Sequence, residues 1–122
     1  MSDKVRLLLV DDEDTIRTLV KHELQAHGYD VDEAESGHIA LEKLAASPFD
    51  LVVLDIRMPE MDGLEVLKNI RANNLAPKVI MLTGVDELKI ARDSLKFGAN
   101  DFLTKPFDFK NLLSCIQRVL KE

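Results

Sequence analysis

Carboxylates follow two short apolar segments of this chain. Asp55 ends the apolar run at residues 51–54, and Asp11 and Asp12 end another at residues 5–10. Open α/β sheets place their chemistry at the carboxyl ends of buried parallel strands. If the two segments are neighbouring strands, at least three carboxylates converge at one edge of a sheet. Such a cluster repels itself and needs a cation, a lysine or protons to offset its charge.

The residue types fit phosphoryl transfer. Asp11, Asp12 and Asp55 offer the hard oxygen ligands that Mg²⁺ takes, although that ion typically accepts only one or two carboxylates directly from protein. Two later apolar segments end in Thr83, a hydroxyl donor, and Lys105, a point charge for a carboxylate or phosphoryl oxygen. An aspartate that attacks phosphorus forms an acyl phosphate and gains about −1.5 to −2 charge. We expect this charge to draw in donors, and movement of Thr83 is a candidate trigger.

These residues must be positioned by elements of alternating type. Short apolar runs predict strands at residues 5–10, 29–34, 51–54, 79–82 and 101–104. Apolar residues at helical spacing predict helices near residues 14–27, 36–44, 64–70, 88–95 and 108–120, with Ser36 and Asp108 as caps. The polar alternation of the second strand indicates a sheet edge. The unbroken apolarity of the third indicates burial on both of its faces.

This alternation predicts an α/β fold, a parallel sheet with helices on both faces. The length of 122 residues suits a single domain, which we place at residues 1–122. All strands of a parallel sheet end on the same side, so Asp11, Asp55, Thr83 and Lys105 reach a common region. Which of them are neighbours depends on the strand order, and the alternation alone does not determine it.

Composition narrows the class of protein. Hydrophobic residues make up 46% of the chain, enough for one packed core. The net charge of −6 argues against nonspecific binding to DNA or to an anionic membrane, which carry the same sign. No apolar stretch approaches the roughly 20 residues that span a bilayer. The single cysteine, Cys115, excludes an internal disulfide and fits a reducing compartment, so we expect a cytoplasmic protein.

Five motifs together resemble the receiver domain of two-component response regulators. They are LVDDE at residues 9–13, LDIRMPEMDG at 54–63, LTG at 82–84, GANDF at 98–102 and KPF at 105–107. Each motif is weak by itself, but the set is specific because the motifs occur in order, most of them at strand ends. The resemblance covers essentially the whole chain and is to stand-alone or isolated receivers of the chemotaxis type.

The resemblance implies a fold and a phosphoacceptor. The fold is flavodoxin-like, a doubly wound five-stranded parallel sheet of order 2-1-3-4-5 with five helices on two faces, which would place Asp55 beside Asp11 and Asp12. Asp55 would accept a phosphoryl group from a histidine kinase or a histidine phosphotransfer protein. Asp11, Asp12, Asp55 and the backbone carbonyl of Arg57 would hold Mg²⁺. We expect the side chain of Arg57 either to shield the phosphoryl group or to compete with the metal for a carboxylate.

The resemblance also assigns the residues that read the modification. Thr83 and Lys105 would contact the phosphoryl group. Phe102 would swing inward as Thr83 moves, which would alter the face formed by the fourth helix, fifth strand and fifth helix. The Lys105–Pro106 peptide bond is expected to be cis on the strength of the resemblance alone.

The function implied is that of a phosphorylation-switched signalling module, not a turnover enzyme. Such a domain assists its own phosphorylation and dephosphorylation. Its partners would be a sensor histidine kinase or phosphotransfer protein, and a downstream target or an output domain absent from this chain. We expect no direct contact with nucleic acid or membrane, and either a monomer or a phosphorylation-dependent homodimer. Lys89, Arg92 and Lys96 lie on the helix by which relatives dimerise or contact targets.

Two other functions use the same residues differently. A haloacid-dehalogenase-like, Mg²⁺-dependent phosphatase would use Asp12 as its nucleophile, but the segment at residues 12–15 lacks the glycine expected before Thr15. A flavodoxin-like carrier of FMN would need amides and hydroxyls at the end of the first strand. This chain has four acids there, at residues 11–14.

Overall fold

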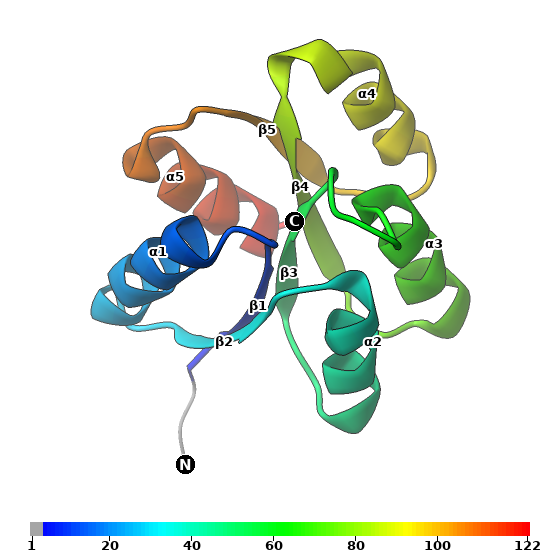
Figure 1. Ribbon diagram of the computed structural model, residues 1–122. Coiled ribbons are helices and arrows are strands. Elements are labelled where there is room, and N and C mark those ends of the chain that lie inside the picture. Colours follow the sequence, from blue (N-terminus) through cyan, green and yellow to red (C-terminus); the bar gives the residue numbers. More distant parts are fainter. Residues whose placement is uncertain (1–3) are drawn as a thin grey trace.

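Five parallel strands form the centre of the molecule, and helices cover both faces of the sheet (Figure 1). The structure is a computed structural model that describes residues 4–122, so the first three residues of the expected domain lie outside the described part. The strands are β1 (Arg6–Val10), β2 (Asp30–Ala34), β3 (Leu51–Asp55), β4 (Lys78–Gly84) and β5 (Asp101–Lys105). Their order, β2-β1-β3-β4-β5, confirms the expected topology.

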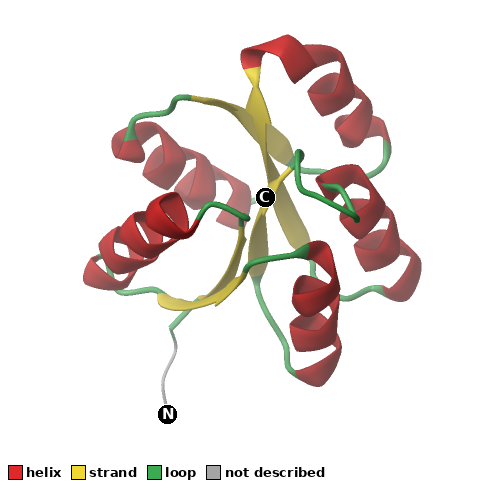
Figure 2. Cartoon of the chain, viewed as in Figure 1, coloured by secondary structure: helices red, strands yellow, loops and turns green. Residues whose placement is uncertain are grey.

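The helices divide into two layers (Figures 1 and 2). They are α1 (Asp14–Ala26), α2 (Gly37–Ala46), α3 (Gly63–Asn73), α4 (Leu88–Lys96) and α5 (Phe109–Leu120), with a 3₁₀ turn, η1 (Val85–Glu87), before α4. Helices α1 and α5 pack on one face of the sheet, and α2, α3 and α4 pack on the other. Among residues 4–122, no helix combines the length and the apolarity needed to cross a membrane.

Two hydrophobic cores lie on either side of the sheet because neighbouring strand residues point to opposite faces. In β1, Leu8 and Val10 face the core under α2, α3 and α4, whereas Leu7 and Leu9 face the core under α1 and α5. Every residue of β3 is buried, as its unbroken apolarity predicted. The polar strand β2 is at an edge of the sheet, which is also as predicted.

Local signals in the sequence begin and end the helices where they were expected. Ser36 accepts a hydrogen bond from the amide of Ile39 at 3.2 Å, and Asp108 accepts one from the amide of Lys110 at 3.3 Å. Gly98 follows α4 with a φ of 103°, a conformation that favours glycine. The side chains of Ser36 and Asp108 thus satisfy amides that have no partner within the helix.

The apolar spacing of the helices overstates the buried stripe at two leucines. Leu19 of α1 and Leu95 of α4 fit that spacing but are 61% and 42% exposed. On α4, Ala91 is buried as the spacing predicts, and the second buried position is the fully buried Ser94. One residue is a rotation of about 100° around a helix, so Leu95 points away from the sheet when Ser94 faces it.

Candidate functional site

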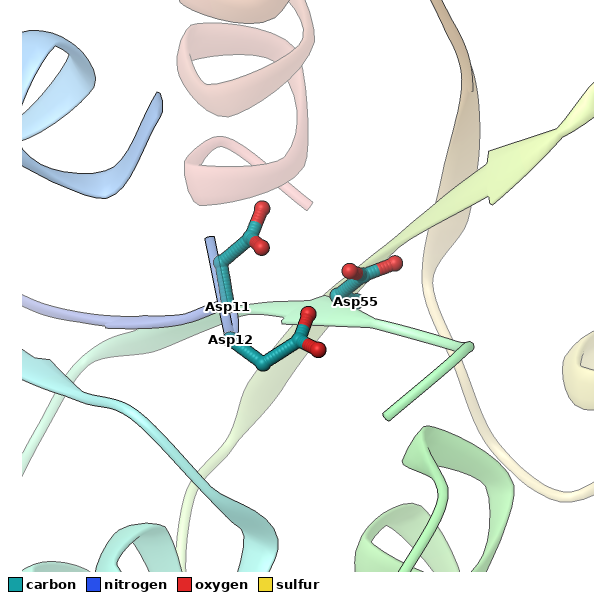
Figure 3. A group of neighbouring side chains, drawn as sticks. All are labelled: Asp11, Asp12 and Asp55. Atoms are coloured by element: carbon teal, nitrogen blue, oxygen red, sulfur yellow. The ribbon is translucent and has the colours of Figure 1, made fainter. Parts of the chain in front are cut away.

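The aspartates of the two first motifs lie side by side at one edge of the sheet. Strands β1 and β3 are neighbours, and Val10 pairs with Leu54. Asp11 and Asp55 directly follow these two residues, so the shared register brings them together (Figure 3). Each of Asp11, Asp12 and Asp55 has a carboxylate oxygen within 4.8 Å of the other two. The convergence of three carboxylates that the sequence suggested is therefore present.

The three carboxylates differ in burial. Asp11 is fully buried and Asp55 is 5% exposed, whereas Asp12 is open to solvent. The donor set suits a hard divalent ion, since the ligands are carboxylate oxygens and the open side leaves room for the waters that Mg²⁺ retains. These residues therefore fit the metal that the resemblance implied.

Lys105 reaches the same cluster from β5. Its Nζ donates to Asp55 Oδ2 at 3.0 Å and to Asp11 Oδ2 at 3.3 Å. The peptide bond between Lys105 and Pro106 is cis, the isomer that the resemblance implies. Among the described residues, Lys105 is the only cation with an ion pair to Asp11 or Asp55. Two of the three carboxylates thus share one ammonium group.

The charge imbalance shows in the acidity of Asp55. Burial raises the pKa of the Asp55 carboxyl from 3.8 to about 6, and the negative charge of Asp11 adds to this, although the ammonium of Lys105 opposes it. Burial also disfavours the charge on Lys105, but the carboxylates of Asp55 and Asp11 outweigh it and raise the pKa of the lysine. The site therefore keeps Lys105 charged and still carries an excess of negative charge.

Thr83 and Gly84 end the next strand, β4. Thr83 is fully buried, and its hydroxyl donates to the carbonyl of Gly84 at 3.2 Å and to that of Glu87 at 3.4 Å. Gly84 pairs with Lys105 in the sheet register, so this strand end adjoins the lysine that holds Asp55. The hydroxyl expected to contact a phosphoryl group thus bonds to the backbone of the β4–α4 connection.

Phe102 lies on the edge strand β5, which is separated from the Asp55 strand, β3, by the Thr83 strand, β4. It pairs with Met81 in the register and packs, partly buried, against the core under α2, α3 and α4. The aromatic ring therefore lies on the α4 side of the sheet, two residues before the position opposite Thr83.

The side chain of Arg57 bonds to carboxylates outside the aspartate cluster. Its guanidinium Nε donates to Glu87 Oε2 at 3.0 Å, and a second nitrogen lies 3.5 Å from Asp86 Oδ2. Sequence reasoning missed Glu87, which is only 8% exposed. No local signal marks it, because an acid just before a helix usually favours the positive end of the helix dipole in solvent. Its partner, Arg57, precedes it by 30 residues.

A cavity of about 300 Å³ joins these groups. Its lining includes Asp12, Asp55, Lys105, Arg57, Gly84 and Glu87. It is large enough for a small tetrahedral anion beside Asp55, and its lining contains an ammonium, a guanidinium and a backbone amide. The guanidinium and the amide bond to Glu87 in this structure.

Arg17 of α1 supports the first strand end from outside the cavity. It is 8% exposed, and its Nη1 donates to the backbone carbonyl of Asp11 at 2.6 Å. Its other nitrogens donate to Glu33 and Asp14, at 2.8 and 2.6 Å. The side chain of Asp11 in turn accepts from the amide of Glu13 at 2.9 Å. Two hydrogen bonds therefore fix the backbone around Asp11, one from Arg17 to its carbonyl and one from the Glu13 amide to its side chain.

A comparison with known families decides between the functions left open. The family model described as the response regulator receiver domain matches residues 7–117. This chain belongs to the receiver family. The receiver family is a family of phosphoacceptor signalling domains rather than turnover enzymes, and its members bind Mg²⁺ at the acidic pocket. Membership does not favour the phosphatase alternative.

Curated relatives of this receiver are longer proteins. It is 42% identical over 118 residues to the transcriptional regulatory protein ZraR of Escherichia coli (strain K12). The aligned segment covers 97% of this chain and 27% of ZraR. It is 39% identical over 116 residues to the alkaline phosphatase synthesis transcriptional regulatory protein PhoP of Bacillus subtilis (strain 168), covering 95% of this chain and 48% of PhoP. The chain thus spans between a quarter and a half of these relatives.

Solved receivers share the whole fold. The chemotaxis protein CheY4 of Vibrio cholerae is 36% identical and superposes with a TM-score of 0.89, covering 95% of this chain and 98% of CheY4. The receiver domain of the Francisella response regulator 1452 is 31% identical, also with a TM-score of 0.89, covering 97% of this chain and 98% of that domain. The flavodoxin-like arrangement is therefore common to this chain and to these structures.

Proposed function

We propose that Asp55 accepts a phosphoryl group and that residues 1–122 work as one receiver domain in a two-component phosphorelay. The observation that carries the proposal is the imbalance at the strand ends. Asp55 is buried, is one of three mutually close carboxylates, and is bonded to a single lysine. A structural cluster would be neutralised, whereas this cluster keeps an oxygen nucleophile beside an anion-sized cavity.

The chain would divide the work of transfer among its own groups. Asp11, Asp12, Asp55 and the backbone carbonyl of Arg57 would hold Mg²⁺, which when bound supplies positive charge for the phosphoryl oxygens. Lys105 holds the nucleophilic carboxylate at 3.0 Å and can pass a hydrogen bond to an oxygen of the arriving group. Preorganised charge of this kind is the main way that proteins accelerate phosphoryl transfer.

The transfer balances as an exchange of one bond for another. A carboxylate oxygen of Asp55 forms a bond to phosphorus while the phosphorus–nitrogen bond of a phosphohistidine breaks. The electron pair of that bond stays on the imidazole nitrogen, which takes up a proton and leaves as neutral histidine. The product is an acyl phosphate on Asp55, and water can later hydrolyse it to restore the carboxylate.

The added charge would then be read through β4 and β5. The hydroxyl of Thr83 is bonded to the backbone of the β4–α4 connection and can turn toward a phosphoryl oxygen. Phe102 packs on the same side of the sheet, so it can follow this movement and alter the α4–β5–α5 face. The target of this changed face would be a downstream protein or an output domain outside this chain. A phosphorylation-dependent homodimer formed through the same face is another form that the response can take.

An apolar groove beside the site suits a protein donor. The groove has a volume of about 710 Å³ and runs along α1 and the β5–α5 connection, where Ile16, Leu19 and Phe109 line it. Lys105 and Glu13 line both this groove and the Asp55 cavity, so the two are continuous. A histidine kinase or phosphotransfer helix that covers the groove would bring its phosphohistidine to Asp55.

The groove has a test that separates docking from chemistry. Replacing the exposed Leu19 by Glu places a charge in the apolar contact, so transfer from a phosphorylated histidine protein should slow at least tenfold. Phosphorylation by a small acyl-phosphate donor should not change, because that donor needs no groove. Equal slowing with both donors would contradict the docking role.

The proposed acceptor is tested by mass spectrometry. Treatment with a small acyl-phosphate donor and Mg²⁺ should add the mass of one phosphate to the wild-type protein and none to Asp55→Asn. Persistence of the added mass in Asp55→Asn would overturn the proposal. Turnover of a phosphomonoester that is lost in Asp12→Asn and kept in Asp55→Asn would favour the phosphatase instead.

A further inference from the structure

The Glu87 carboxylate occupies the donors that an incoming phosphoryl group would use. Its Oε1 accepts from the amide of Gly84 at 3.2 Å, and its Oε2 accepts from Arg57 Nε at 3.0 Å. The Glu87 side chain is only 10% exposed, although the Arg57 side chain that bonds to it is 70% exposed. Hydrogen bonds to a charged acceptor are stronger than neutral ones.

These donors belong to the Asp55 cavity. Gly84, Arg57 and Glu87 line that cavity together with Asp55 and Lys105. Gly84 pairs with Lys105, whose ammonium bonds to Asp55, so the Gly84 amide lies one strand from the atom that would carry phosphorus. A phosphoryl group on Asp55 would therefore compete with the Glu87 carboxylate for the same donors.

The backbone of Glu87 ties the same turn to Thr83. The Thr83 hydroxyl donates to the Glu87 carbonyl at 3.4 Å, and Glu87 ends the 3₁₀ turn that precedes α4. The space at Gly84 is filled, since a Cβ added there would lie 2.8 Å from Asp86 Oδ1 and 3.3 Å from Glu87 Oε1. The turn before α4 is thus closed on itself through one glutamate.

We propose that Glu87 is an internal anion that holds the β4–α4 turn in its unphosphorylated form and that phosphorylation of Asp55 must displace. This inference rests on the proposed function. A phosphoryl group would take over the Gly84 amide and the Arg57 guanidinium, and the freed turn would release the Thr83 hydroxyl. Glu87 is therefore a positioning residue. Its bonds to the turn must break before the phosphoryl group can bind there, so they reduce the net binding free energy of that group.

The test measures binding of beryllium fluoride, a noncovalent phosphoryl mimic, in the presence of Mg²⁺. Glu87→Ala removes the competing acceptor, so the protein should bind the mimic about tenfold more tightly, a change that corresponds to about 1.4 kcal/mol. Glu87→Gln keeps a neutral acceptor and should show a smaller gain. A residue with a merely structural role would weaken binding when removed.

Asp86→Asn is the matched control for charge. Asp86 lines the same cavity and pairs with Arg57, but its side chain is 69% exposed, and its charge is therefore screened by salt. We expect a gain of about twofold at most for this variant, which disappears at high salt, whereas the gain in Glu87→Ala persists. Equal gains in the two variants would show that charge alone acts and would overturn the inference.

The amide resonance of Gly84 gives a direct readout of the displacement. In the wild-type protein the mimic should shift this resonance strongly, and in Glu87→Ala the resonance should lie away from its wild-type position before any mimic is added. Tight binding by the wild type with unchanged or weaker binding by Glu87→Ala would contradict the inference alone. Failure of every variant, the wild type included, to bind the mimic would contradict the proposed function as well.

Discussion

Two clusters of charged residues adjoin β1, and they treat their carboxylates in opposite ways. The Arg17 cluster consists of Arg17, Lys21, Asp14 and Glu33, with two cations for two carboxylates. The Asp55 cluster consists of Asp11, Asp12, Asp55 and Lys105, with one cation for three carboxylates. Both clusters contain buried charge and short ion pairs, so contact distances do not distinguish them.

Acidity separates the two clusters. Hydrogen bonds from Arg17 and Lys21 hold the pKa of Glu33 below its ordinary value of 4.5. Burial raises the pKa of Asp55 to about 6 in spite of Lys105. A cluster whose charges balance stabilises the fold. A cluster with excess negative charge favours the binding of a cation or a proton. The contrast is consistent with a structural role for the Arg17 cluster and with the phosphoryl transfer that we propose for the Asp55 cluster.

The largest effect is expected at the cation of the Asp55 cluster. Lys105→Met removes the ammonium that holds Asp55, and loss of one such charged donor typically slows a reaction by about 10²–10³-fold. The rate of phosphate incorporation from a small donor with Mg²⁺ measures this. Lys110→Met, at the exposed start of α5, is the control and should keep the wild-type rate. A Lys105→Met rate within tenfold of wild type would place the catalytic charge elsewhere.

The cation of the Arg17 cluster should act on stability instead. Arg17→Met leaves Glu33, Asp14 and the Asp11 carbonyl without its three hydrogen bonds, so the free energy of unfolding should fall by about 1–3 kcal/mol. Urea unfolding measures the loss. Arg92→Met, exposed on α4, provides the baseline. The comparison between clusters breaks down if Arg17→Met is as stable as wild type but accepts no phosphate.

The raised pKa of Asp55 predicts an unusual dependence of stability on pH. The fold favours the protonated acid, so this contribution is complete below pH 3.8 and is lost as pH rises through about 6. With metal removed by a chelator, the wild type should lose roughly 1–2 kcal/mol of stability relative to Asp55→Asn between these limits. Unfolding curves of both proteins across this range would measure it. A constant difference between the two would show that Asp55 titrates normally.

The smallest effect is expected at Glu33, and it has the opposite sign. The depressed pKa means that its stabilising contribution is present above pH 4.5 and is lost as pH falls further. Because the side chain is 30% exposed, Glu33→Gln should cost only about 0.5–1 kcal/mol at neutral pH. The gap from wild type should close in acid. A gap that widens in acid would contradict the assignment of this cluster as a balanced ion pair.

The sequence predicted the features of the site that follow from the positions of the strand ends. Asp11, Asp55, Thr83 and Lys105 all follow or end apolar runs, and parallel strands must bring such ends to one edge. The strand order came from the motifs and not from the alternation of elements. The roles of the individual residues in phosphoryl transfer stay predictions, because position alone does not reveal reactivity.

The parts that sequence reasoning missed depend on partners far apart in the chain. Glu87 is buried because Arg57 reaches it from another loop, and Arg17 is buried because β2 supplies Glu33. Neither residue carries a local signal, since charged residues on helical segments are mostly solvated. The exposure of Leu19 has a related cause, because a helical stripe shows which residues share a face but not how wide the contact is.

Chemical trapping of the phosphorylated residue tests the central claim most directly. Borohydride reduces an acyl phosphate to an alcohol and so converts a phosphorylated aspartate to homoserine, which peptide sequencing by mass spectrometry locates. After treatment with a small acyl-phosphate donor and Mg²⁺, we predict homoserine at position 55 and unmodified aspartate at positions 11 and 12. Homoserine at position 11 or 12, or at none of the three, would contradict the assignment of Asp55 as the phosphoacceptor.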